Sequence, residues 1–174
     1  MKVYFITHGI TEDNEAGIAS GWNDTKLSQL GIQQAKEQGE RFRDIKVDLI
    51  CCSDLNRVIE TVKIAFRDKL PVITDWRLRE INYGDLNGKP TDIVDPMNKR
   101  RIDEPFPSGE SYEQAIARIH DFCRELKDSH AEKVILIVGH SATRFGLDTF
   151  VDKRNLEDCL SVPSMWQPYW EYDL

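Results

Sequence analysis

The sequence has few features of a secreted, membrane-spanning or disulfide-stabilised protein. Only four of its 174 residues are cysteine, and none stands in a C-x-x-C pair. We therefore expect buried free thiols in a reducing cytoplasm. The longest aliphatic run, Val134–Val138, is far shorter than the roughly 20 residues that a membrane-spanning helix needs. The apolar stretch near the N-terminus is likewise too short for a signal peptide.

Negative charge exceeds positive charge. The 23 Lys and Arg residues against 30 Asp and Glu residues give a formal net charge of −7, which argues against nucleic acid as a partner. Hydrophobic residues make up 40% of the chain and charged residues 30%, a balance typical of a folded globular protein. We expect one domain over residues 1–174, with an irregular inserted loop at about residues 87–110.

Strand and helix patterns alternate along the chain. Apolar runs predict strands over residues 3–6, 47–52, 71–73, 134–138 and 169–172. Helical spacing predicts a helix over residues 28–45 with its apolar face on Leu30, Ala35, Phe42 and Ile45, a second helix capped by Asp54, and a long helix after Gly109. In the long helix, Ser111 and Gln114 form a capping-box pair. This order predicts an α/β three-layer sandwich, with a mostly parallel central sheet and helices on both faces.

Two of the four histidines follow predicted strands after a single intervening residue. His8 comes one residue after the first strand, and His140 follows the strand that ends at Val138. Each lies beside a glycine, which lets the backbone approach a ligand. Because the carboxyl ends of parallel strands meet at one edge of a sheet, we expect these two side chains at one site. For His120 and His130 we expect packing or surface roles.

Arg57 and Glu80 also follow predicted strands, the second and third along the chain. Two imidazoles with a guanidinium favour a phosphoryl group, because arginine pairs with phosphate oxygens in a fork. A neutral imidazole can attack phosphorus, and a carboxylic acid can protonate the leaving oxygen. The four residues together therefore predict phosphoryl transfer.

The same residues stand in six short motifs that occur in a fixed order. These are T-H-G at 7–9, S-G-W-N-D at 20–24, S-D-L-N-R at 53–57, L-R-E-I-N-Y-G at 78–84, P-S-G-E-S at 107–111 and G-H-S at 139–141. In this order they resemble the histidine phosphatase superfamily, which contains the cofactor-dependent phosphoglycerate mutases. The resemblance covers nearly the whole chain. It implies a phosphoglycerate mutase-like fold in which the inserted loop caps the pocket.

The resemblance also implies roles for individual residues. His8 corresponds to the phosphate-accepting nucleophile, Arg57 and His140 to phosphate-binding groups, and Glu80 to the general acid. Further residues would line the substrate site: Thr7, Gly9, Asn14, Ser20, Gly21, Ser141 and Arg144. No metal and no cofactor are expected. The expected partner is a small phosphorylated metabolite, and the expected assembly is a monomer or a homodimer.

One position departs from the family pattern. Thr7 stands where the family has the arginine that precedes the nucleophilic histidine. Losing one positive clamp on a phosphoryl group should lower the rate by roughly 10²–10³-fold, by analogy with removal of an oxyanion-hole donor. Arg144, or a basic residue of the Lys99–Arg101 cluster, could fill the vacated space.

Two functions therefore remain open. One is a metal-independent phosphatase that acts on a small phosphate monoester, with hydrolysis favoured over mutase activity because the chain is shorter than the mutases. The other is a weakened family member that binds phosphorylated ligands without turnover. A metal hydrolase that uses His8, His140 and Asp24 or Glu80 lacks H-x-x-x-H spacing. The aromatic stretch at residues 166–170 predicts a closing strand with a lid or, alternatively, an exposed dimer patch.

Overall fold

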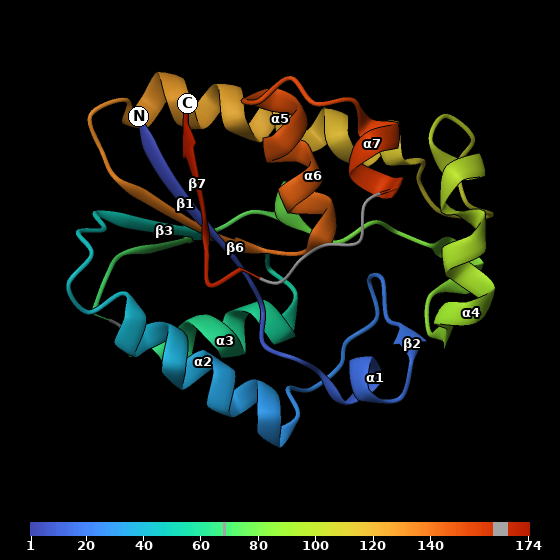
Figure 1. Ribbon diagram of the computed structural model, residues 1–174, viewed down its shortest axis with the longest axis horizontal. Helices are drawn as coiled ribbons and strands as arrows, with labels where there is room; N and C mark the ends of the chain where they lie inside the picture. Colours follow the sequence, from blue (N-terminus) through green and yellow to red (C-terminus); the bar gives the residue numbers. More distant parts are fainter. Residues whose placement is uncertain (68, 162–166) are drawn as a thin grey trace.

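A five-stranded sheet forms the centre of the molecule (Figure 1). The structure, a computed structural model, describes residues 1–67, 69–161 and 167–174. The strands lie in the order β4-β3-β6-β1-β7, and β7 alone runs antiparallel to its neighbour. Their bounds are β1 (Lys2–Thr7), β3 (Leu49–Cys52), β4 (Val72–Thr74), β6 (Ile135–Gly139) and β7 (Trp170–Asp173). The predicted mostly parallel α/β sheet is confirmed.

Helices cover both faces of this sheet (Figure 1). On one face lie α2 (Gln29–Arg41) and α3 (Asn56–Phe66), and on the other α5 (Tyr112–His130) and α6 (Ser141–Phe150). Successive residues of a strand point to opposite faces, so Phe5 packs in the core beside α5 while Ile6 packs in the core beside α2 and α3. All five residues of β6 are buried, as expected for a strand covered on both faces. All four cysteines are buried free thiols, as predicted.

Two of the predicted helix starts are confirmed. The hydroxyl of Ser28 accepts the Gly31 N–H and begins α2. Ser111 and Gln114 form the capping box of α5, each side chain accepting the backbone N–H of the other residue. These side chains satisfy N–H groups that have no partner within the helix.

Three other details of the sequence prediction are wrong. Asp54 does not cap α3, because its carboxylate instead binds the Arg79 guanidinium at 2.7 and 2.6 Å, and Leu55 precedes the helix without a side-chain cap. Leu30 does not join the apolar face of α2, because it is 51% exposed. Helix α2 also ends at Arg41, before the predicted end at residue 45.

Short elements build the remaining side of the molecule. A two-stranded sheet of β2 (Ile18–Ala19) and β5 (Lys89–Pro90) joins the first loop to the inserted segment. Val94 and Phe106 are almost completely buried in a small core with Ile81 and Tyr112, so the inserted segment is packed against the body of the domain. The other short elements are α1 (Glu12–Glu15), η1 (Trp76–Leu78), η2 (Gly84–Leu86), α4 (Thr91–Val94), η3 (Asp95–Arg101) and α7 (Leu156–Ser161).

The two ends of the chain lie side by side (Figure 1). The amino group of Met1 donates to the carbonyl of Leu174 at 2.8 Å, and β7 supplies the predicted last strand. Trp166, part of the predicted aromatic lid, lies outside the described residues. No helix in the described part of the chain has both the length and the apolar character needed to cross a bilayer.

The packing of α5 against α6 depends on Gly146. A methyl group added at Gly146 would overlap Cγ2 of Ile119 on α5. In the interior of a helix, replacing glycine by alanine normally stabilises the helix by about 1 kcal/mol. We expect the overlap to dominate, so that Gly146→Ala lowers the free energy of unfolding by about 1–3 kcal/mol, measured by urea unfolding.

A double variant provides the control for this prediction. Ile119→Ala removes the overlapping methyl group, so the double variant should lose less stability than the sum of the two single changes. A Gly146→Ala protein as stable as the wild type would contradict the packing argument.

Candidate active site

The register of two parallel strands brings His8 and His140 together. Thr7 at the end of β1 lies beside Gly139 at the end of β6, so the next residue of each strand is a histidine. The His8 N–H donates to the Gly139 carbonyl at 3.1 Å. The two imidazole ring centroids are 5.1 Å apart. The two histidines singled out in the sequence therefore share one site.

Arg57 enters this site from the first turn of α3 and is 2% exposed. Its guanidinium donates to the carbonyls of Gly21 at 2.7 Å and Asn23 at 3.1 Å, which fixes it against the first loop. Nη2 also lies 3.4 Å from Nδ1 of His140. Arg57 thus places a buried positive charge directly beside the second histidine.

The contact with Arg57 fixes the tautomer of His140. A guanidinium has only N–H donors, so Nδ1 of His140 accepts and Nε2 carries the proton. Nε2 is buried and has no hydrogen-bond partner among the described residues. Burial, and then the charge of Arg57, hold the pKa of His140 well below its ordinary value of 6.5. His140 is therefore neutral at pH 7, with one unused N–H donor.

His8 has the opposite tautomer. Its Nδ1 lies 2.7 Å from the Gly9 carbonyl, which can only accept, so Nδ1 carries the proton and Nε2 keeps a lone pair. Burial, and then the charge of Arg57, lower the pKa of His8 to about 4. A Cβ at Gly9 would overlap the Gly31 carbonyl, so only glycine allows this loop to approach the start of α2. The Gly9 N–H donates to the Thr61 hydroxyl at 3.1 Å.

Glu80 lies in the segment after η1, and its carboxylate contacts the first turn of α6. Its Oε1 accepts the N–H of Ile81 at 2.9 Å and of Ala142 at 3.2 Å, and no described hydrogen bond uses Oε2. Glu80 borders a cavity of about 450 Å³, and among the other residues that line it are Tyr83, Asp95, Lys99, Tyr112 and Ser141. Within the described residues, no group of three or more His, Cys, Asp or Glu side chains could hold a metal ion.

The substrate-binding residues expected in the first loop have other partners in the structure. The Asn14 side chain accepts the Thr11 N–H at 3.0 Å and caps α1. The Ser20 hydroxyl donates to Asp13 at 2.8 Å. Gly21 contributes its carbonyl, which accepts from Arg57. These contacts shape the loop around Arg57.

Arg144 and Arg101, considered above as substitutes for the missing arginine at position 7, both have other partners in the structure. Thr7 borders a small cavity of about 110 Å³ together with His8, Gly9 and residues of α2. The guanidinium of Arg144 lies over the rings of Phe145 and Trp170, 5.1 and 5.5 Å from their centroids. Arg101 binds Glu104 at 2.7 Å. Lys99, by contrast, borders the Glu80 cavity.

The sequence did not identify two residues that hold the Glu80 backbone. The indole Nε1 of Trp22 donates to the Glu80 carbonyl at 2.6 Å, and Nη2 of Arg118 donates to the same carbonyl at 3.0 Å. Arg118 is a charged residue three positions after Ala115 and four before Phe122, both on the apolar face of α5. That position was the available signal, because a buried arginine needs partners.

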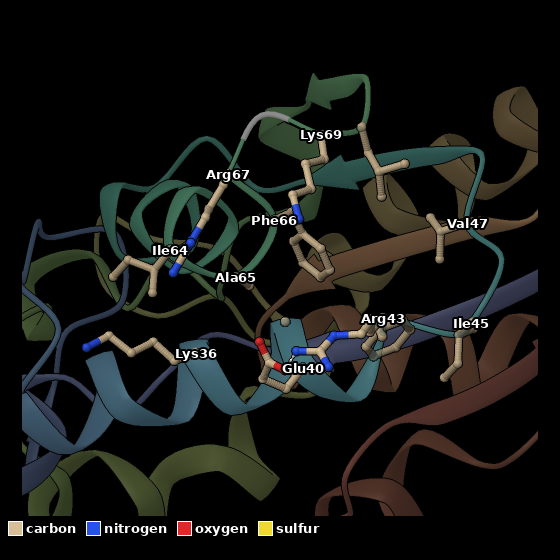
Figure 2. A pocket seen from close by; sticks show the side chains of 13 residues that line it. Lys36, Glu40, Arg43, Ile45, Val47, Ile64, Ala65, Phe66, Arg67 and Lys69 are labelled. Atoms are coloured by element: carbon tan, nitrogen blue, oxygen red, sulfur yellow. Dashed lines mark ion pairs between the residues drawn. The ribbon is translucent and has the colours of Figure 1, made fainter.

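A separate cavity of about 470 Å³ lies where α2 and α3 end (Figure 2). The buried rings of Phe42 and Phe66 are among the apolar residues that line it. The basic side chains of Lys36, Arg43, Arg67 and Lys69 also line it. Arg43 is engaged in an ion pair with Glu40. None of the expected site residues lines this cavity.

The low pKa of His8 predicts a pH-dependent stability. In the unfolded chain His8 returns to its ordinary pKa of 6.5, whereas in the folded protein it stays neutral down to about 4. Between these values the unfolded state binds more protons, so the free energy of unfolding should fall as the pH is lowered from about 6.5 to about 4. His8→Asn should flatten this slope in urea unfolding at a series of pH values. Equal slopes for both proteins would contradict the assignment.

Comparisons with known proteins identify the family of this chain. A model of the histidine phosphatase superfamily (branch 1) matches residues 3–148. A 2,3-bisphosphoglycerate-dependent phosphoglycerate mutase of Lachnoclostridium phytofermentans is 29% identical over 203 aligned positions, which cover 93% of this chain and 82% of that protein.

Two solved structures have the same fold over nearly the whole chain. YhfR of Bacillus stearothermophilus is 27% identical with a TM-score of 0.86, over 98% of this chain and 89% of that one. A mycobacterial glucosyl-3-phosphoglycerate phosphatase, solved with VO3, is 28% identical with a TM-score of 0.83, over 98% and 91%. With its ordered motifs, its sheet and its paired histidines, this chain belongs to the histidine phosphatase superfamily.

Proposed function

We propose that the protein is a metal-independent phosphatase that hydrolyses a small phosphate monoester through a phosphohistidine on His8. The observation that carries the proposal is the pair of neutral imidazoles of opposite tautomer, with ring centroids 5.1 Å apart. One imidazole offers a lone pair, the other an N–H donor, and Arg57 lies beside them. Membership of the histidine phosphatase superfamily supports the same chemistry.

In the first step, Nε2 of His8 attacks phosphorus. The pKa of about 4 keeps this nitrogen unprotonated at pH 7, so it is available as a nucleophile. As the N–P bond forms, the P–O bond to the alcohol breaks and positive charge develops on the ring. The Gly9 carbonyl, which accepts from Nδ1, stabilises that charge. Glu80 gives its proton to the departing alcohol oxygen.

Arg57 and His140 bind the transferring phosphoryl oxygens. The Nε–H and one Nη1–H of Arg57 have no described acceptor, and neither has the Nε2–H of His140. The Nε2–H of His140 is buried without a partner among the described residues, at a cost of about 1–3 kcal/mol that a phosphoryl oxygen would remove. Phosphoryl transfer depends mainly on such positioning and charge stabilisation.

In the second step, water attacks the phosphohistidine. Glu80, now a carboxylate, takes a proton from this water as its oxygen bonds to phosphorus. The N–P bond breaks, inorganic phosphate leaves and His8 regains its lone pair. Glu80 is then protonated again for the next cycle.

The cavity beside Glu80 is the proposed site of the leaving alcohol. Its volume of about 450 Å³ suits a small metabolite, and the charged side chains of Asp95 and Lys99 border it. The names of the similar proteins concern phosphoglycerate and glucosyl-3-phosphoglycerate, which are small phosphorylated metabolites. Four buried free thiols fit a reducing, cytoplasmic location.

A second candidate function rests on Thr7. The hydroxyl of Thr7 supplies no positive charge, and the structure holds Arg144 and Arg101 against other partners. A protein that binds phosphorylated ligands with little turnover would have such a site. Retention of the nucleophile, the acid and both phosphate-binding groups favours the phosphatase.

Turnover of an aryl phosphate in EDTA separates these two functions. We expect the wild type to release phosphate and His8→Ala to lose that activity. Thr7→Arg should raise kcat/KM by roughly 10²–10³-fold, because it restores a charged donor to the phosphoryl site.

The other outcomes are equally informative. A silent wild type with an active Thr7→Arg variant would contradict an active phosphatase and favour the weakened family member that binds phosphorylated ligands. Full activity in His8→Ala, or no activity in either the wild type or Thr7→Arg, would contradict the phosphatase proposal.

A further inference from the structure

The side chain of Arg118 uses all five of its N–H groups within the protein. It is 6% exposed on α5, and its Nε and Nη2 donate to the Glu110 carboxylate at 3.1 and 2.6 Å. Nη1 donates to the carbonyls of Arg77 at 2.6 Å and Arg79 at 2.9 Å. Nη2 also donates to the carbonyl of Glu80 at 3.0 Å. One buried guanidinium therefore binds three carbonyls of the segment that carries the proposed acid.

Glu110 extends this clamp beyond Glu80. Its Oε1 accepts the Asn82 N–H at 2.9 Å, and its own N–H donates to the Asn82 carbonyl at 3.0 Å. The pair of Arg118 and Glu110 thus binds the backbone on both sides of Glu80. Charge-assisted hydrogen bonds of this kind are roughly twice as strong as neutral ones.

Trp22 holds the same carbonyl from the opposite loop. Its indole Nε1 donates to the Glu80 carbonyl at 2.6 Å, and its ring lies 4.7 Å from the Arg79 guanidinium. The carbonyls of its neighbours Gly21 and Asn23 both accept from Arg57. The loop that anchors the phosphate-binding arginine therefore also anchors the backbone of the acid.

We propose that Arg118 and Trp22 are positioning residues that set the place of the Glu80 carboxylate relative to the phosphoryl site. The proposal rests on the proposed phosphatase function, in which Glu80 protonates the leaving alcohol. An acid must lie within hydrogen-bond reach of that oxygen, and a displacement of about 1 Å can cost about 10²-fold in rate. The two donors meet at the one carbonyl that belongs to Glu80 itself.

The dependence of the rate on the leaving group tests this role. An aryl phosphate releases a good leaving group that hardly needs a proton, whereas an alkyl phosphate requires one. Arg118→Lys keeps the charge but loses the fork, and Trp22→Phe keeps the ring but loses the N–H. Arg124→Lys, a change at an exposed arginine of the same helix that pairs with Asp121, is the matched control.

We expect both test variants to lower kcat/KM for the alkyl phosphate by about 10–10²-fold. The aryl phosphate should lose no more than about threefold, because little proton transfer is needed. The control should match the wild type with both substrates. Equal losses with the two substrates would show a merely structural role and overturn the proposal, as would no loss in either test variant.

A second readout does not depend on turnover. The amides of Ile81 and Ala142 donate to Glu80 Oε1, so their hydrogen exchange and chemical shifts report the place of the carboxylate. Both test variants should speed exchange at these amides, and Arg124→Lys should not. Unchanged amides would overturn the positioning role. A wild type silent with both substrates would refute only the proposed function, because the amides would still decide the positioning role.

Discussion

The parallel pairing of β1 with β6 is the constraint on which the site depends. Thr7 and Gly139 face one another at the ends of these strands, and the next residue of each chain segment is a histidine. A shift of one residue would send every side chain of β1 to the opposite face and separate the two rings. The buried hydrophobic side chains of both strands oppose such a shift, because they belong to packed cores on the two faces of the sheet.

The buried charge of Arg57 determines how these two histidines behave. Burial disfavours a charged imidazole, and a cation 3.4 Å from His140 disfavours it further, so both rings stay neutral. Two carbonyl oxygens and one imidazole nitrogen accept from the Arg57 guanidinium and hold it in place. Its Nε–H and one Nη1–H have no described acceptor. The site thus holds a fixed positive charge, an N–H donor and a lone pair, an arrangement suited to a phosphoryl group.

The sequence could predict what depends on local patterns. The apolar run at residues 134–138 predicted the central strand, and Ser28 and Ser111 predicted the starts of α2 and α5. The positions of His8 and His140 after strands predicted that the two rings would lie together. The sequence could not show the partners of buried charges. Aspartate is a favoured residue at a helix N-cap, but Asp54 binds Arg79, which is distant in sequence. Arg118 meets the Glu80 backbone only after α5 packs on the sheet.

The most direct test of the central claim is the capture of the phosphoenzyme. The protein is mixed with a radiolabelled phosphate ester, quenched within one turnover and digested, and the labelled peptide is identified. We predict a label that is lost in acid but stable in base, carried by the peptide that contains His8 and absent from His8→Ala. Phosphate release at the normal rate without this label, or a label on another residue, would contradict the account.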